Sequence, residues 1–340
     1  AAYLPQEILL YELNSGHKLI DIPLRTPHFE QRYGGSPYMA IHRVDFHNLL
    51  LDACRACPNI DLSQLTQVVA YQTSGSGASV TTTDGRTLQG RAVIGADGLR
   101  SRLRQQLHPG DVSRDTGYVA HRAIVAMSQA PASIRERLGV TMWTGPGFHT
   151  IYYPLRGRDE MNIVVVVQVP PGFDTTDDDR YREHLAALTR HASAEAREVL
   201  ALVNLERRWA IADREPIRRW SDGCFTLIGD AAHATLQSLA QGAGMAVEDA
   251  VVLADLVDDC GGNFAEAFQR FERLRFLRTA RVQLESRSLW TMYHCDGAEA
   301  EVRTQQLLER SADDFYRCLD WLWNPGALVS GTAPSPSFST

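Results

Sequence analysis

The stretch Phe225-Thr-Leu-Ile-Gly-Asp-Ala-Ala-His233 gives the clearest indication of fold in this sequence of 340 residues. Its apolar and β-branched residues end in Gly-Asp, which predicts a buried strand that stops at a carboxylate. A glycine-rich turn, Ala240-Gln-Gly-Ala-Gly244, comes next, and Met245-Ala-Val-Glu-Asp-Ala250 begins a predicted helix. The apolar side of that helix is predicted to consist of Ala246, Ala250, Leu253, Ala254 and Val257.

A strand end, a carboxylate, a glycine-rich turn and a helix start together predict a place to hold a polar ligand. Asp230 can accept hydrogen bonds from the hydroxyls of a sugar or polyol. The unpaired N–H groups at the helix start, with the positive end of the helix dipole, favour negative charge. By itself this pattern indicates a cofactor site without naming the cofactor.

Two other segments add to this pattern. Arg91-Ala-Val-Ile-Gly-Ala-Asp-Gly-Leu-Arg-Ser-Arg-Leu-Arg104 is a second apolar strand that runs into a glycine-containing turn. There Gly98 permits close approach of the backbone, and Asp97 and Arg104 supply charge at the end of the strand. Tyr38-Met-Ala-Ile-His-Arg-Val-Asp-Phe-His-Asn-Leu-Leu-Leu51 leads from a short strand through His42-Arg43 into a helix with an apolar face.

In this order and spacing the three segments resemble the single-component FAD-dependent aromatic hydroxylases, the class A flavoprotein monooxygenases. The likeness covers roughly residues 1 to 325. It implies a mixed α/β fold, in which an FAD/NAD(P)-binding Rossmann-like layer is interleaved with a mainly β substrate domain. It also implies FAD as cofactor and NADH as reductant, with NADPH as the alternative. The cofactor-binding residues that it implies are Arg43, Asp97, Gly98, Arg104, Gly229, Asp230, Gly242, Ala243 and Gly244.

One departure from the family is large. Its members begin with a strand, a Gly-x-Gly-x-x-Gly turn and a helix that seat the FAD pyrophosphate, and this sequence has no such fingerprint. The nearest glycine cluster, Gly75-Ser-Gly77, lacks the third glycine and the strand–turn–helix setting. We therefore expect a Rossmann-like layer without its first βαβ unit, through loss of upstream residues or natural truncation. Such a chain should bind FAD weakly or not at all.

The order of the predicted elements implies interleaved domains. We expect an FAD-binding layer of residues 42–115 and 215–290, and a β-rich substrate domain of residues 1–41 and 116–214. Residues 291–330 should form a C-terminal helical segment, and the Pro/Ser-rich residues 331–340 a disordered tail. A junction between the two layers is the expected place for an aromatic substrate.

Several local patterns predict particular elements. Hairpin turns are predicted at Asn14-Ser-Gly16 and at Asp84-Gly85. One helical stretch is predicted from Tyr181 into Leu205, and a long one from Phe264 to Leu289. The simplest interpretation of the arginines in the long helix is a solvated face, formed by Arg270, Arg273, Arg275, Arg278 and Arg281.

Composition and charge exclude several classes of function. The formal net charge is −7, which does not favour nucleic acid as a partner, and no apolar run approaches the ~18 residues of a membrane span. Cys54 and Cys57 have CxxC spacing but no second ligand pair, so we expect no metal site and six reduced cysteines. No hydrolase or kinase motif occurs. The expected protein is cytoplasmic, and a homodimer is an expectation from the family alone.

The family's chemistry implies a role for three further residues. A flavin hydroperoxide attacks an electron-rich ring, so the protein must make a substrate phenol more like a phenolate, which suits a histidine. His149 is our candidate, and Tyr153 should share its face of a strand. With Gln237 they resemble the substrate site of 3-hydroxybenzoate 6-hydroxylases, which convert 3-hydroxybenzoate to gentisate with NADH.

Plainer interpretations stay open for each residue. His149 could be a hydrogen-bonded structural histidine, Tyr153 a packed ring and Gln237 a turn cap. Structural alternatives are also open for Arg43 (an ion pair with Asp45), for Asp97 and Arg104 (a salt-bridged turn) and for His233 (a brace of the turn rather than a catalyst). For the whole chain, the alternatives are salicylate 1-hydroxylation or another FAD-dependent aromatic hydroxylation and, from a different class, a truncated non-catalytic ligand-binding module.

Overall fold

The computed structural model describes residues 2–75 and 77–324. The chain divides into two compact units, and each is formed by separate stretches of sequence. The first unit comprises residues 1–61, 117–210 and 291–340, and the second comprises residues 62–116 and 211–290. The predicted tail at 331–340 lies outside the described residues.

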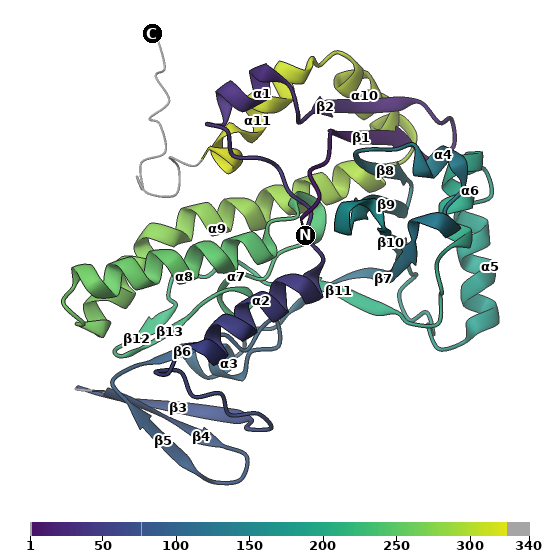
Figure 1. The fold of residues 1–340 in the computed structure, drawn as a ribbon. Helices are drawn as coiled ribbons and strands as arrows, with labels where there is room; N and C mark the ends of the chain where they lie inside the picture. The colour runs from purple at the N-terminus through teal and green to yellow at the C-terminus, as the bar shows by residue number, and fades with distance from the viewer. Residues whose placement is uncertain (1, 76, 325–340) are drawn as a thin grey trace. The chain divides into compact units, whose positions relative to one another are not determined.

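The first unit is built on a sheet with the strand order β11-β7-β10-β9-β8-β1-β2 (Figure 1). Its strands are β1 (Glu7–Glu12), β2 (Lys18–Pro23), β7 (Arg114–Ala126), β8 (Val140–Gly145), β9 (Phe148–Leu155), β10 (Glu160–Gln168) and β11 (Trp209–Asp213). From β7 to β2 the pairs are antiparallel, except that β1 and β8 are parallel. The predicted first hairpin is confirmed, because β1 and β2 pair across a turn in which Gly16 has φ +72°.

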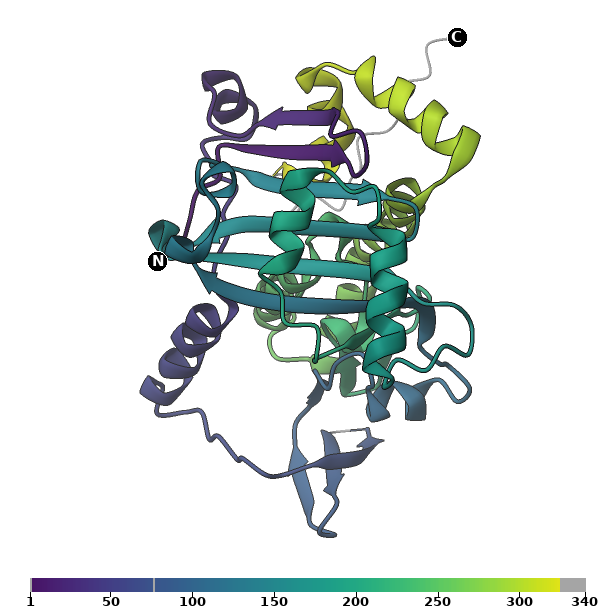
Figure 2. The ribbon, with the colours of Figure 1, turned by 90° about the vertical axis from the view of Figure 1, so that its right-hand side faces the viewer.

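Two helices, α5 (Asp178–Leu188) and α6 (Ala194–Ala201), lie across one face of this sheet (Figure 2). Alternate residues of a strand point to opposite faces, so Phe148, Ile163 and Val165 meet these helices in the core. Burial of each such apolar side chain contributes about 1.5–3 kcal/mol to the stability of the fold.

The helix predicted from Tyr181 into Leu205 is two helices, α5 and α6. The second begins after Ser193, which caps it with its side chain.

The remaining elements of the first unit are helical and short. They are α1 (Pro27–Arg32), α2 (Arg43–Ala56), η1 (Met127–Gln129), α4 (Ala132–Arg135), η2 (Arg156–Arg158), α10 (Gly297–Leu308) and α11 (Ala312–Trp323). The last residues of α9, described below, also belong to this unit.

The unit boundaries differ from the expected ones in two places. Residues 291–323 belong to the first unit, because α11 is tied to it: Arg32 forms a 2.6 Å ion pair with Asp320. Residues 42–61, expected in the cofactor layer, also fall in the first unit, where Asp45 forms a 2.5 Å ion pair with Arg156.

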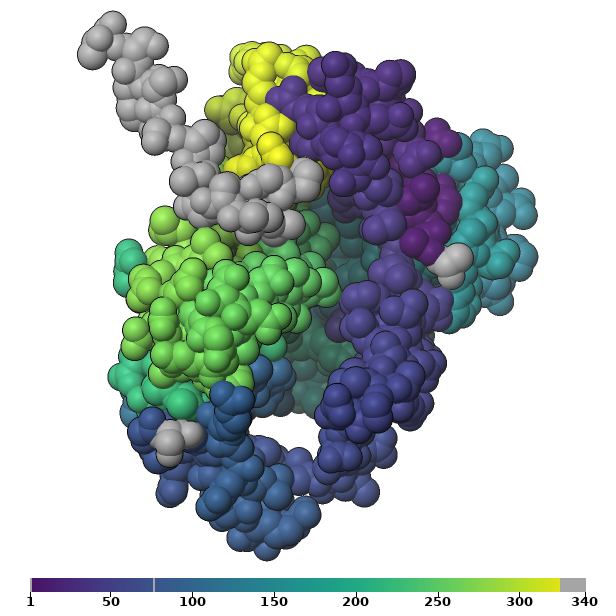
Figure 3. All heavy atoms as spheres, turned by 60° about the vertical axis from the view of Figure 1, so that its left-hand side comes forward, coloured from purple at the N-terminus to yellow at the C-terminus, as the bar shows by residue number. Residues whose placement is uncertain are grey.

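Helix α2 has the predicted apolar side chains, but none of its residues is buried against the described chain. Leu49, for instance, keeps 63% of its surface exposed. The dark blue segment in Figure 3 shows this helix at the surface. An apolar stripe therefore predicted the helix correctly without predicting its burial.

The second unit contains two small sheets and four helices. Its strands are β3 (Val68–Ser74), β4 (Gly77–Thr82), β5 (Thr87–Gly90), β6 (Val93–Gly95), β12 (Ser221–Asp222) and β13 (Phe225–Leu227). Its helical elements are α3 (Arg102–Leu107), α7 (Asp230–His233), η3 (Gln237–Leu239), α8 (Gly242–Asp259) and α9 (Phe264–His294). β13 and β6 are parallel neighbours, so the two predicted motif strands end at the same edge. The hairpin predicted at Asp84-Gly85 joins β4 to β5.

Close packing around Gly95 holds the two motif strands together. A Cβ on Gly95 would lie 2.9 Å from Leu227, 3.3 Å from Leu103 and 3.3 Å from Phe225. Phe225 also stacks on Tyr71, with ring centroids 3.7 Å apart. The absence of a side chain at Gly95 thus allows α3 and β13 to approach the end of β6.

Gly95→Ala should lower the free energy of unfolding by about 1–3 kcal/mol, because an added methyl group overpacks a filled core. Urea unfolding followed by circular dichroism measures this. Gly75→Ala is the matched control, since its Cβ would meet nothing within 4 Å, and should change stability by less than about 1 kcal/mol. Equal stabilities of the two variants would contradict the packing described.

Candidate functional site

The Gly-Asp turn at the end of β13 is the first part of the candidate site. Gly229 has φ +57°, and a Cβ there would lie 3.3 Å from the Cβ of Ala246, so this position favours glycine. Asp230 follows as the first residue of α7 and is exposed. Its Oδ1 lies 3.9 Å from where a Cβ on Gly242 would be. The carboxylate therefore lies beside the first turn of α8.

The start of α8 supplies hydrogen-bond donors next to that carboxylate. No side chain caps the helix, and the first backbone bond runs from the Met245 N–H to the Gln241 carbonyl at 2.8 Å. The amides of Gly242, Ala243 and Gly244 come before that bond and have no acceptor within the helix. An exposed carboxylate beside such amides fits a ligand that carries both hydroxyls and electron-rich oxygens, as FAD does.

Asp249 holds this turn in place from inside α8. It is wholly buried, and its carboxylate accepts bonds from Gly229 N (2.9 Å), His233 Nε2 (2.6 Å) and Arg275 Nε (2.8 Å). Burial opposes ionisation of the carboxyl, but the bond from His233 and the charge of Arg275 outweigh it and lower the pKa of Asp249. These contacts support the structural interpretation of His233.

Two expectations about the helices are wrong in part, for the same reason. Of the predicted apolar side of α8, Leu253 is buried and Ala246 and Val257 are half-buried, but Ala250 and Ala254 are exposed. The buried side consists of Met245, Asp249, Leu253 and Leu256. Arg275, expected on a solvated face of α9, is only 2% exposed. A buried carboxylate turns α8 toward α9 and requires a cation opposite, which an apolar pattern does not indicate.

The Asp97–Arg104 segment forms a second turn at the same sheet edge. Asp97 accepts bonds from Ser101 Oγ (2.5 Å) and Arg102 N (2.9 Å), and Ser101 caps α3. Gly98 has φ +79°, and a Cβ there would meet nothing within 4 Å, so the turn is open on that side. Charged groups were predicted at this turn, and the exposed carboxylate of Asp97 is one of them.

The guanidinium of Arg104 forms hydrogen bonds to other groups of the second unit. It is wholly buried and donates to the Ala232 carbonyl (2.7 Å), the Glu215 carbonyl (3.0 Å) and Asp111 (2.6 Å). Through these bonds α3 is tied to α7, which begins with Asp230. Arg104 thereby positions the Gly-Asp turn.

His149 and Tyr153 lie on the face of β9 opposite the packed core of the first unit. His149 is 3% exposed, and its Nδ1 lies 2.8 Å from Nε2 of His294, the last residue of α9. Burial, together with the neighbouring His294 ring, holds the pKa of His149 well below its usual range. His149 is therefore a neutral imidazole at neutral pH.

Tyr153 has two cations near it. Burial raises its pKa, while the guanidinium groups of Arg122 and Arg43 oppose the rise. Asp45, the expected partner of Arg43 in the structural alternative, is instead paired with Arg156 and, at 3.8 Å, with His42. The guanidinium groups of Arg43 and Arg122 both act electrostatically on Tyr153, on the face of β9 that carries His149.

Sequence reasoning missed Arg122 and His294. Arg122 lies opposite Val164, which lies opposite Ile151, so strand register brings Arg122 beside the His149 face. Only pairing of the strands could have indicated this. His294 is 145 residues away from His149 in sequence, and its position at the end of a long helix carries no local signal.

The predicted site residues are divided between the two units. His149, Tyr153 and Arg43 lie in the first unit, and the Asp97, Gly229 and Gly242 segments in the second. Gln237 begins η3 of the second unit and is half-buried. The cofactor and substrate roles predicted for these residues stay predictions.

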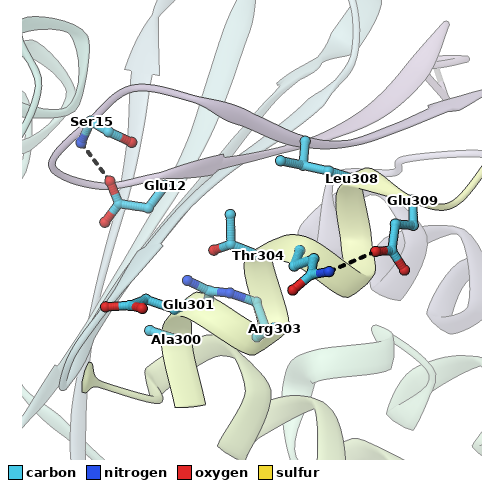
Figure 4. A pocket seen from close by; sticks show the side chains of 9 residues that line it. Glu12, Ser15, Ala300, Glu301, Arg303, Thr304, Leu308 and Glu309 are labelled. Atoms are coloured by element: carbon cyan, nitrogen blue, oxygen red, sulfur yellow. Dashed lines mark hydrogen bonds between the residues drawn. The ribbon is translucent and has the colours of Figure 1, made fainter. Parts of the chain in front are cut away.

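A cavity of about 610 Å³ lies elsewhere, between the β1–β2 hairpin and α10 (Figure 4). It is lined by Glu12, Ser15, Ala300, Glu301, Arg303, Thr304, Gln305, Leu308 and Glu309, none of which is a predicted site residue. Arg303 is 6% exposed and donates from Nη1 to the Met292 carbonyl at 3.2 Å. It therefore supports the end of α9, two residues before His294.

Searches of the described residues give three further results. They contain no cluster of three or more metal-ligating side chains. Among them, all six cysteines are free thiols. No helix in that part of the chain is long and apolar enough to cross a membrane.

Comparison with known proteins gives concordant results. A family described as "FAD binding domain" matches residues 14–257. The chain is 36% identical over 328 residues to a 3-hydroxybenzoate 6-hydroxylase of Polaromonas naphthalenivorans (strain CJ2), covering 95% of this chain and 80% of that protein. It is 34% identical to a 3-amino-4-hydroxybenzoate 2-monooxygenase of Streptomyces cremeus, covering 92% and 78%.

Among solved structures, Klebsiella pneumoniae HpxO complexed with FAD and uric acid has the same fold. The TM-score is 0.82 at 24% identity, and the match covers 96% of this chain and 82% of that one. The mixed α/β fold is therefore that of FAD-containing proteins.

Asp249→Ala should lower the free energy of unfolding by about 3–5 kcal/mol, because it removes the buried acceptor shared by Gly229 N, His233 and Arg275. Arg275 then keeps Glu248, at 2.8 Å, as its carboxylate partner. In the wild type the pKa of Asp249 is lower in the folded state than in the unfolded state. The unfolded state therefore binds this proton first as pH falls, and the free energy of unfolding should decrease below about pH 4. Denaturant unfolding at several pH values measures both effects. The exposed Asp255→Asn on the same helix is the control; an equally small effect of both substitutions would contradict the role of Asp249.

Proposed function

The chain belongs to the FAD-dependent class A aromatic hydroxylases, and from that premise we propose that it converts 3-hydroxybenzoate to gentisate with NADH and O2. That it is a flavin-dependent aromatic hydroxylase follows from membership of the family. The choice of substrate is our inference, because its relatives act on several substituted benzoates.

The residues present in the second unit fit FAD. Asp230 is proposed to accept hydrogen bonds from the ribityl hydroxyls, and the amides of Gly242, Ala243 and Gly244 to donate to ring oxygens. Asp97 and Gly98 would form the second contact at the same edge, and Arg104 would act through its bonds to α7. Arg43 is proposed as a further flavin contact from the first unit. Bound FAD, once reduced, supplies activated oxygen to the substrate ring.

The face of β9 that carries His149 and Tyr153 is the observation on which the proposed substrate rests. A phenolic acid has a phenol oxygen at one end and a carboxylate at the other. The neutral imidazole of His149 suits the phenol, and the guanidinium of Arg122, near Tyr153, suits the carboxylate. Tyr153 would pack against the ring, and Gln237 would donate an amide hydrogen bond.

Substrate choice is tested by NADH consumption with excess FAD and each of 2-, 3- and 4-hydroxybenzoate, with identification of the products. Excess FAD keeps the cofactor saturating in every assay. We expect gentisate from 3-hydroxybenzoate. Catechol from 2-hydroxybenzoate would favour salicylate 1-hydroxylation instead. No hydroxylated product from any of the three would favour a ligand-binding module and overturn the proposal.

The two halves of the site should respond differently to substitution. His149→Ala should lower hydroxylation by about 10²-fold or more and leave the Kd for FAD unchanged, because it removes only proton transfer at the phenol. Asp230→Ala should mainly weaken FAD binding. Flavin fluorescence titration and product formation, measured on both variants, separate the effects. Loss of FAD from His149→Ala would contradict this division of roles.

A further inference from the structure

The cavity between the β1–β2 hairpin and α10 has the properties of a separate binding site. Its volume is about 610 Å³, and every residue that lines it belongs to the first unit. None of these residues belongs to the Gly-Asp turn or to the face of β9 that carries His149 and Tyr153. Cavities that hold small organic molecules have volumes of about 300–1,000 Å³. The chemistry of the cavity walls therefore indicates which molecules fit.

Arg303 contributes a positive charge that is buried without a counter-ion. It is 6% exposed, and its Nη1 donates to the Met292 carbonyl at 3.2 Å. Within the described part of the chain its Nε has no acceptor, and no carboxylate forms an ion pair with its guanidinium. Burial of a charge is costly unless hydrogen bonds and an opposite charge compensate for it. A carboxylate bound in the cavity would supply that opposite charge.

The other buried arginines all have a carboxylate partner inside the protein. Arg104 and Arg214 share Asp111, at 2.6 and 2.7 Å. Arg275 has two carboxylate partners, each at 2.8 Å. Among the described residues, Arg303 is thus the one buried arginine without such a partner. The planar guanidinium can bind a carboxylate through two parallel hydrogen bonds, so a carboxylate is the group that we expect there.

The other charged residues of the cavity are acidic, namely Glu12, Glu301 and Glu309. Glu12 accepts bonds from backbone amides of the hairpin turn, and Glu309 accepts one from Gln305 at 2.9 Å. Glu301 is exposed and forms no hydrogen bond or ion pair with the residues that the structure describes. Figure 4 shows Glu301 on the side of α10 that faces Glu12. Three negative charges and one positive charge disfavour a simple anion, so the ligand should also carry a cation.

Part of the cavity wall is apolar. Leu308 keeps 59% of its surface exposed, and Ala300 adds a methyl group to the lining. Covering an exposed leucine with an apolar group is favourable, because it removes apolar surface from water. The lining therefore combines partners for a carboxylate, a cation and an apolar group.

We propose that this cavity binds a zwitterionic α-amino acid with a large apolar side chain. The carboxylate of the amino acid pairs with Arg303, its ammonium group lies toward Glu301, and its side chain covers Leu308. Such a ligand gives each of the two unpaired charges a partner and leaves the net charge of the lining unchanged. Binding at this site requires neither the flavin nor the phenolic acid.

The class of ligand is tested with three probes that share a phenyl group and a short carbon chain. L-Phenylalanine carries both charges, 3-phenylpropanoate only the carboxylate and 2-phenylethylamine only the ammonium group. Isothermal titration calorimetry with the full chain, without flavin, measures each Kd. We expect L-phenylalanine to bind, and the two other probes to bind at least about 10-fold more weakly, because each lacks one charge-assisted bond.

Two results would overturn the proposal. One is the absence of saturable binding of L-phenylalanine up to about 10 mM. The other is equal affinity for L-phenylalanine and for either probe with a single charge, since the zwitterion would then have no advantage.

The place of binding is tested with substitutions on α10. Arg303→Gln and Glu301→Gln should each raise the Kd of L-phenylalanine about 10-fold or more. The matched controls are Arg310→Gln and Glu299→Gln, which change the same residue types at exposed positions outside the cavity. Each control should leave the Kd within about twofold of the wild type, because exposed charges contribute little.

Circular dichroism shows whether each variant keeps its helices. Because Glu301 is exposed, Glu301→Gln tests the site even if Arg303→Gln destabilises α10. An unchanged Kd in a folded Glu301→Gln variant, or in a folded Arg303→Gln variant, would place the amino acid elsewhere and contradict the proposed site.

Discussion

The carboxylate of Asp249 is the contact on which the second unit depends. It joins the backbone of the Gly229 turn to His233 and to Arg275 of α9, all at hydrogen-bond distance and away from solvent. An ion buried in this way is stable only when its partners are complete. The exposed Asp230 and the uncapped start of α8 are therefore presented by a turn that has little freedom to move.

Arg104 repeats this arrangement from α3, the helix that follows the neighbouring strand β6. It is wholly buried and binds carbonyls near the same turn, so two buried guanidinium groups, Arg104 and Arg275, fix one short segment from two sides. Asp230 is exposed beside the start of α8, whereas Asp97, which is also exposed, accepts bonds from Ser101 and Arg102 within its own turn. The buried charges hold the Gly-Asp turn, and the carboxylate of Asp230 is the group proposed to bind the ligand.

Much of the fold could be predicted from the sequence, because its signals are local. The Gly16 and Gly85 hairpins, the strand before Gly229 and the long helix from Phe264 all follow from periodicity and turn residues. The burial of Asp249 and Arg275 could not be predicted, since each needs a partner distant in sequence.

The same limit applies to the candidate site. His149 and Tyr153 are four residues apart on one strand. Because side chains alternate between the two faces of a strand, they share a face, as the sequence predicted. Arg122 and His294 reach that face only through strand pairing and the path of α9. The predicted site residues lie within sequence motifs, whereas Arg122 and His294, which lie near His149 and Tyr153, have no local signal in the sequence.

The central claim is that one chain binds both a flavin and a phenolic acid and brings them together. The most direct measurement is the visible spectrum of FAD with the protein as 3-hydroxybenzoate is added. We predict a saturable change in the flavin absorption bands, because the bound acid alters the surroundings of the isoalloxazine ring. A flavin spectrum that stays that of free FAD at saturating protein, with and without the acid, would contradict the account.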